Sequence, residues 1–221
     1  MDCGTKVISM KFNRFCSAGL GLVMVFLFNG CVGFQGFIKK TGPEYEAEVQ
    51  AWQRVIEQRG GDGMWLVNRG YRTGDNIVAI ATCSALSHVG ILDAENGVVI
   101  ESLWNGNVTN SLANFVDMSH RVVLVQPKGW TPETGREALA KARGEMEKKY
   151  DFSGLIGLPS TNRWYCSELA SWCWGREANR FGPWNVIHPR RLPKMGTVLF
   201  DSGPRDGKSD ERVPTHNAAA W

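Results

Sequence analysis

Two short apolar segments separated by a turn-forming run predict a β-hairpin near the middle of the chain. The first, SHVGIL, covers residues 87–92, and the second, VVIESL, covers residues 98–103. Asp93–Asn96 between them is rich in residue types that form turns. RVVLVQP (121–127) and GTVLF (196–200) share the β-branched, apolar character of strands. We expect these segments to form one antiparallel sheet.

A further apolar run, GDNIVAIAT at residues 74–82, lies ahead of the hairpin. Its length and its entry through Gly74-Asp75 predict another strand of the same sheet. The preceding residues, through Trp65 and Tyr71, are interpreted as a loop.

Three segments have the end signals or the composition of helices. Pro43 opens the first, which Gly60-Gly61 ends, and its apolar residues follow the helical period: Tyr45, Val49, Trp52 and Ile56. Thr131-Pro132 supplies an N-cap and a proline for the second, which we expect to end near Lys149. The third is expected at residues 163–177. Helices segregated from an antiparallel sheet are typical of an α+β domain.

The first thirty residues resemble a secretory signal. Basic residues precede an uncharged, mostly apolar stretch at residues 16–28, which is shorter than the ~20 residues that a membrane-spanning helix needs. The stretch ends in LFNGC, so Cys31 is predicted to be the lipid-attachment site of a lipoprotein. Cleavage by an ordinary signal peptidase, or a retained anchor, are the alternatives.

The predicted organisation is therefore a signal peptide (1–30), a tether (31–42), one folded domain (43–200) and a disordered tail (201–221). Without residues 1–30 the formal charge falls from +3 to +1, which argues against nucleic acid as a partner. We expect a cell-envelope protein, held at the membrane by its lipid or secreted.

Cys166 is the candidate nucleophile because it lies in WYCSELASWCW (164–174), near the expected start of a helix. A thiolate is stabilised at a helix N-terminus and by a neighbouring imidazole. Cys173 lies about 10 Å further along the same helix and cannot pair with it, but a Cys83–Cys173 disulfide stays open. The cysteine spacing suggests no zinc site, and no cofactor is expected.

His88 is the candidate base among four histidines. His216 lies in the expected tail, His120 in a polar loop expected at the surface, and His188 in a loop before Pro189. His88 instead begins an apolar strand, where a titratable ring calls for an explanation. A half-buried strand histidine with a satisfied hydrogen bond is the competing interpretation.

Glu101 is the candidate residue that orients His88, since it is an acid within an otherwise apolar strand. A four-residue loop at Asp93–Asn96 would place His88 directly opposite Glu101. A two-residue turn at Asn96-Gly97 would separate them by about 13 Å. The sequence leaves both registers open.

Five motifs then resemble one family. GDNIVAIATCSALSHVGIL, VVIESLWNG, YDFSGL, WYCSELASW and NVIHPRRL, in that order over about residues 70–195, are similar to the YiiX/YebB-like group of circularly permuted, NlpC-type papain-like cysteine hydrolases. In that group the histidine strand precedes the cysteine helix. The resemblance implies a permuted papain-like fold with an antiparallel sheet packed against helices.

The resemblance also implies that Cys166 is the nucleophile, His88 the base and Glu101 the orienting residue. The Cys166 backbone N–H would donate to the oxyanion. Tyr165 is predicted to bind substrate as a pocket wall, with a packed aromatic beside Trp164 as the alternative. The expected partner is a peptide or acyl substrate.

Three functions remain open at this point. The leading one is an exported hydrolase that cleaves amide bonds, with cell-wall peptides as candidate substrates. The second is a lipid acyltransferase or esterase of the same fold. The third is a non-catalytic envelope binding module in which Cys166 is a packed thiol or pairs with Cys83.

Overall fold

The computed structural model describes residues 38–205, except residues 83, 159, 161 and 176–185. Their centre is a six-stranded sheet of order β4-β3-β2-β1-β5-β8, in which every neighbouring pair is antiparallel. Its strands are β1 (Trp65–Gly70), β2 (His88–Asp93), β3 (Val98–Leu103), β4 (Gly106–Ser111), β5 (Ser119–Pro127) and β8 (Gly196–Asp201). The four strands expected between residues 87 and 200 are confirmed.

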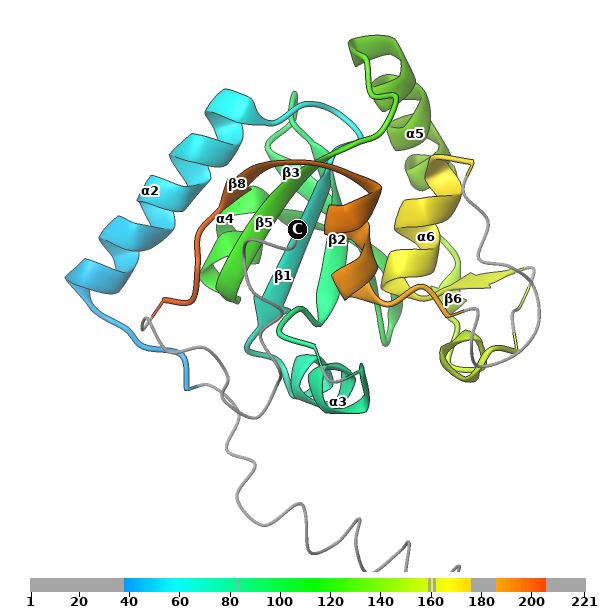
Figure 1. The fold of residues 1–221 in the computed structure, drawn as a ribbon, viewed down its shortest axis with the longest axis horizontal. Helices are drawn as coiled ribbons and strands as arrows, with labels where there is room; N and C mark the ends of the chain where they lie inside the picture. Colours follow the sequence, from blue (N-terminus) through cyan, green and yellow to red (C-terminus); the bar gives the residue numbers. More distant parts are fainter. Residues whose placement is uncertain (1–37, 83, 159, 161, 176–185, 206–221) are drawn as a thin grey trace, which may run out of the picture. The chain divides into compact units, whose positions relative to one another are not determined.

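Helices cover both faces of this sheet (Figure 1). On one face, α2 (Pro43–Arg59) and α4 (Leu112–Asp117) bury Trp52, Ile56 and Phe115 against the strands. On the other face, α5 (Pro132–Gly144), α6 (Cys166–Cys173) and the 3-10 helix η3 (Pro189–Met195) form a second core cluster. The domain is therefore α+β, as the sequence pattern predicts.

The start of α5 follows the predicted capping chemistry. The Thr131 hydroxyl accepts a hydrogen bond from the Thr134 N–H at 3.3 Å, and the Thr134 hydroxyl accepts one from the Thr131 N–H at 2.8 Å. The helix ends at Gly144, five residues before the expected end at Lys149.

Residues 74–82 form a helix, so the predicted strand is wrong. They belong to α3 (Thr73–Thr82), whose first turn contains Asp75. The Asp75 carboxylate accepts a hydrogen bond from the Arg72 N–H at 3.1 Å, which satisfies a backbone group that the helix leaves unpaired. A short apolar run does not distinguish strand from helix by periodicity alone, and this cap decided between them.

Two strands of the six-stranded sheet were missed. The expected loop through Trp65 is the central strand β1, all six residues of which are buried. Its apolar run is only three residues long, because the polar residues Asn68 and Arg69 follow, so the sequence gives little strand signal. Strand β4 forms one edge of the sheet. Its sequence, GNVTNS, is polar, so strand propensity gives little signal for it.

The cysteine helix begins three residues later than expected. Arg163–Trp164 form strand β7, which pairs in parallel with β6 (Lys149–Tyr150), and the 3-10 helix η1 (Gly154–Ile156) lies between them in sequence. The Trp164 carbonyl accepts a hydrogen bond from the Ser102 hydroxyl at 2.7 Å, which ties β7 to β3. Cys166 is consequently the first residue of α6.

The fold also continues past its predicted end at residue 200. Asp201 completes β8, and the Arg205 guanidinium lies 3.8 Å from the Trp52 ring centre and 2.6 Å from the Glu48 carboxylate. The remaining tail (206–221), the signal segment and Cys31 lie outside the described residues. Within the described ranges, no helix has the length and apolar character needed to cross a membrane.

Candidate active site

The hairpin that carries His88 and Glu101 has neither of the two expected registers. Its loop is Ala94–Gly97, and Glu101 lies opposite Gly90. Asp93 stays in β2, and its carboxylate accepts hydrogen bonds from the backbone and the side chain of Asn96 at 3.2 and 2.9 Å. This side-chain turn moves the loop one residue along the chain and shifts every pair in the hairpin.

His88 and Glu101 nevertheless meet. Nε2 of His88 and Oε2 of Glu101 are 2.7 Å apart. They occupy diagonal positions on one face of the sheet, a separation that a long side chain spans. Gly90 leaves the space between them open, since a Cβ there would lie 3.3 Å from Cγ of Glu101.

The Glu101 carboxylate is completely buried and has two further partners. Asn110 of β4 donates to Oε1 at 2.6 Å, and Nη1 of Arg72 lies 3.4 Å from Oε2. Burial by itself raises the pKa of Glu101, but the hydrogen bond and charge of His88, with help from Asn110 and Arg72, outweigh it and lower the pKa. The carboxylate therefore stays ionised next to the imidazole.

Cys166 is a further partner of the His88 imidazole, besides Glu101. The residue is 6% exposed and lines the same pocket as His88. Burial by itself lowers the pKa of His88, but the Cys166 thiolate and then Glu101 raise it well above its ordinary value. Because Glu101 holds Nε2, Nδ1 is the ring nitrogen that is available to the thiol of Cys166.

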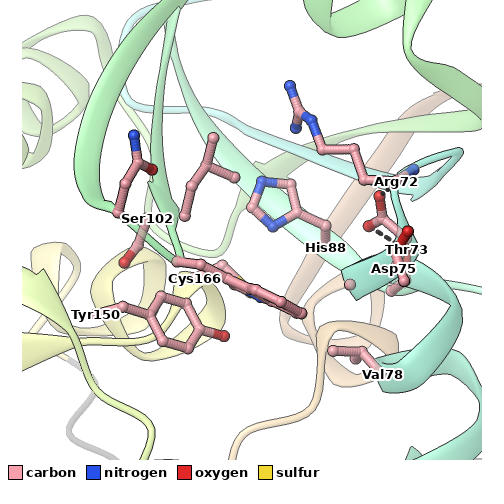
Figure 2. Close-up of a pocket in the computed structure, with 13 residues that line it drawn as sticks. Arg72, Thr73, Asp75, Val78, His88, Ser102, Tyr150 and Cys166 are labelled. Atoms are coloured by element: carbon pink, nitrogen blue, oxygen red, sulfur yellow. Dashed lines mark hydrogen bonds between the residues drawn. The ribbon is translucent and has the colours of Figure 1, made fainter.

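The pocket has a volume of about 380 Å³. Figure 2 shows the His88 ring with Cys166 and Tyr150 on one side and Arg72 and Asp75 on the other. The lining residues come from the start of α3 and the segment before it, the ends of β2 and β3, and single positions at β6 and α6: Arg72, Thr73, Gly74, Asp75, Val78, Ser87, His88, Ser102, Leu103, Trp104, Asn105, Tyr150 and Cys166. A pocket of this size takes a small chemical group or a few residues of an extended chain.

Asp75 links the pocket wall to the histidine strand. Besides capping α3, its carboxylate accepts a hydrogen bond from the Ser87 hydroxyl at 2.8 Å. Ser87 directly precedes His88, and its hydroxyl also accepts one from the Gly70 N–H at 3.2 Å. The end of β1, the start of α3 and the start of β2 are thereby held together.

Tyr165 does not line the pocket. Its side chain is 2% exposed and packs with Tyr150 and Val186, and its hydroxyl accepts a hydrogen bond from the Ile187 N–H at 3.0 Å. The predicted substrate-binding role is therefore replaced by a packed aromatic at the N-cap of α6. Tyr150 is the tyrosine that lines the pocket.

Two other titratable side chains are buried, and one of them, His120, was expected at the surface. Glu168 is buried, and its carboxylate accepts a hydrogen bond from the Tyr165 N–H at 3.4 Å. Burial, with the charge of Asp151, raises the pKa of Glu168 to about 7. His120 is buried, with its ring centre 5.8 Å from that of Tyr71.

Cys173 is a buried free thiol, and burial raises its pKa to about 12. Cys83, which the sequence left open as a disulfide partner of Cys173, lies outside the described residues. No group of three or more metal-binding side chains occurs in the described part of the chain.

Arg72, Asn110 and Tyr150 were missed by sequence reasoning. Arg72 and Asn110 reach Glu101 from a strand end and an edge strand that the pattern did not reveal. Tyr150 lies in the motif YDFSGL, so the family resemblance was the one available signal for it.

Replacing Gly90 with alanine tests how the His88–Glu101 pair is placed. The new Cβ would lie 2.2 Å from Cγ1 of Val99 and 3.3 Å from both Glu101 and Phe115. We expect a loss of about 1–3 kcal/mol in the free energy of unfolding, measured with urea. The imidazole proton resonance of His88 should also shift.

Gly144→Ala is the matched control, because a Cβ at Gly144 meets nothing within 4 Å and alanine favours helix. It should leave stability unchanged or raised. Equal stability of the two variants would show that Gly90 is not needed for close packing around Glu101.

Comparison with known proteins identifies the family. Residues 68–200, more than half of the chain, match the family described as "Permuted papain-like amidase enzyme, YaeF/YiiX, C92 family". The order of the elements agrees with it, since β2 with His88 precedes α6 with Cys166.

The other comparisons add little. No curated protein matches the chain. Among solved structures, one similar chain is described as metalloprotein yiiX from Escherichia coli O157:H7. It is 23% identical, with a TM-score of 0.45, and the match covers 52% of this chain and 64% of that one. From the family match, this chain belongs to the permuted papain-like amidases of the YaeF/YiiX, C92 family and has their permuted papain-like fold.

Proposed function

We propose that this protein is an exported cysteine hydrolase that cleaves amide bonds through Cys166, His88 and Glu101. Membership of an amidase family supports amide hydrolysis in general. The assignment of the three residues is supported by the buried 2.7 Å bond between His88 and Glu101, since His88 lines the same pocket as Cys166.

In the first half of the proposed reaction, the Cys166 thiolate attacks the carbonyl carbon of the amide. A C–S bond forms, and the carbonyl oxygen takes the negative charge. The intermediate then collapses and the C–N bond breaks. His88 delivers its Nδ1 proton to the departing nitrogen, which leaves a thioester on Cys166.

In the second half, neutral His88 takes a proton from water, and the resulting hydroxide adds to the thioester carbonyl. The C–S bond breaks, a carboxylic acid leaves, and the thiolate–imidazolium pair is restored. Ionised Glu101 holds Nε2 throughout and stabilises the imidazolium each time it forms.

Two donors are proposed for the oxyanion. One is the Cys166 backbone N–H, which lies in the first turn of α6 and has no helical acceptor. The other is the Tyr150 hydroxyl, which lies in the same pocket. Burial and the negative charge at Cys166 raise the pKa of Tyr150, so its hydroxyl keeps the proton that it would donate.

The thiolate–imidazolium pair is tested by the pH dependence of Cys166 alkylation with iodoacetamide, followed by peptide mass spectrometry. Because the pKa of His88 is raised, its imidazolium persists from acid through neutral pH. The wild-type rate should therefore reach its plateau near or below neutral pH. In His88→Ala the pH at which the alkylation rate rises should move toward about 8.5, where ordinary thiols ionise.

Cys173 is an internal control in the same digest, since a buried thiol with a pKa of about 12 should stay unmodified in both folded proteins. Alkylation profiles of Cys166 that coincide in wild type and His88→Ala would contradict the proposed pair.

Tyr150→Phe separates oxyanion stabilisation from thiolate activation. Acylation of Cys166 by a nitrophenyl ester passes through an oxyanion, whereas alkylation by iodoacetamide does not. We expect acylation to slow by about 10²-fold, within the range for loss of one oxyanion donor, with alkylation unchanged. Equal losses in both reactions would assign Tyr150 to thiolate activation or packing instead.

Export and lipid attachment at Cys31 rest on the sequence alone. Mass spectrometry of the protein from a membrane fraction should find the N-terminal peptide beginning at an acylated Cys31. In Cys31→Ala the acylated peptide should be lost and processing should stop. An unmodified Cys31 in the processed protein would exclude the lipoprotein assignment and leave secretion.

A further inference from the structure

Exposed apolar side chains gather around the mouth of the pocket. Among the described residues, nine large apolar side chains are exposed, and seven of them lie in three segments next to the pocket. We call this group the apolar rim; its members are Ile77 and Ile80 of α3, Trp104, Phe152, and, in and after η1, Leu155, Ile156 and Leu158.

The rim is continuous with the pocket. A Cβ on Gly74 would lie 2.9 Å from the Trp104 indole, so this ring packs against the first turn of α3. The ring centres of Trp104 and Phe152 are 6.4 Å apart, and those of Phe152 and Tyr150 are 4.9 Å apart. Trp104 and Tyr150 line the pocket, so the rim begins where the pocket opens.

The rim also lacks charge. Residues 76–87, 102–110 and 152–162 contain no Asp, Glu, Lys or Arg, although 21% of the chain is charged. A peptide or a nucleic acid recognised through ion pairs would find no partner in these segments. The chemistry that matches them is a hydrocarbon surface with an aromatic residue at its edge.

Most rim residues lie outside the pocket. Ile77, Phe152, Ile156 and Leu158 are not among its lining residues, and Ile156 is 64% exposed. A single acyl chain bound in the pocket would leave them in water. Covering them requires a partner with a surface broad enough to contact all three segments at once.

We propose that the apolar rim docks the catalytic domain onto an uncharged lipid bilayer, so that substrate reaches Cys166 from the membrane surface. The inference rests on the proposed function, including a lipid on Cys31. From that lipid, residues 32–42 span at most about 40 Å when extended, which keeps the domain within reach of the bilayer. Apolar side chains of interfacial proteins enter the boundary between headgroups and acyl chains by about 5–10 Å.

The test uses the full chain on vesicles of phosphatidylcholine with and without bromine on the acyl chains, because bromine quenches nearby indole fluorescence. Trp104→Phe isolates the signal of one rim residue among nine tryptophans. Subtracting the fluorescence of this variant from that of the wild type leaves the fluorescence of Trp104. The brominated lipid should strongly quench this difference. An N-terminal anchor is present in both proteins, so it cancels in the difference.

Ile77→Ser/Ile156→Ser should reduce the quenching of Trp104 at least severalfold. The matched control is Val198→Ser, which replaces an exposed apolar residue on β8, at the other edge of the sheet, and should leave the quenching unchanged. Equal quenching of wild type and Trp104→Phe would overturn the proposal.

Absence of quenching, together with a dimer that Ile77→Ser/Ile156→Ser dissociates, would overturn the proposal in favour of a second copy of the chain as the partner. Alkylation of Cys166 needs no vesicles, so failure of membrane docking and failure of the proposed hydrolase are read separately.

Discussion

The hydrogen bond between His88 and Glu101 is the interaction on which the candidate site depends. It joins neighbouring strands across a glycine, and it fixes which imidazole nitrogen faces the thiol. The cost of burying Glu101 is offset by Asn110 and Arg72, which supply a second hydrogen bond and a positive charge. Gly90 makes room for the Glu101 side chain, and Asn110 of the edge strand β4 binds it, so the sheet keeps this buried carboxylate ionised.

The family resemblance implied that Glu101 orients His88, but neither register considered from the sequence is the one that brings them together. A turn that begins one residue later places Gly90 opposite Glu101, and the pair forms diagonally. Strand pattern identifies which residues share a face, because side chains alternate with a period of two. The pattern does not determine which residues lie directly opposite one another. Here the turn formed by the Asp93 side chain decided the register of the hairpin.

The other errors in the fold have related physical causes. Pattern reasoning finds elements with a helical period or a continuous β-branched, apolar run, so it found α2, β3 and β5. It missed β1 because Asn68, Arg69 and Gly70 cut its apolar run short, and β4 because its sequence is polar. Tyr165 was assigned to the pocket from its place beside Cys166, whereas the α6 N-cap turns it into the core.

The misassigned segment at residues 74–82 connects the fold to the proposed membrane surface. Its composition is apolar enough for a strand inside a sheet, yet the chain forms a helix and leaves Ile77 and Ile80 in water. A surface helix ordinarily carries charged residues on its outer face, and α3 has none after Asp75. A partner that covers α3 would remove these apolar side chains from water. Because Asp75 ties the same helix to Ser87, directly before His88, a membrane that contacts α3 would contact an element joined to the strand that carries His88.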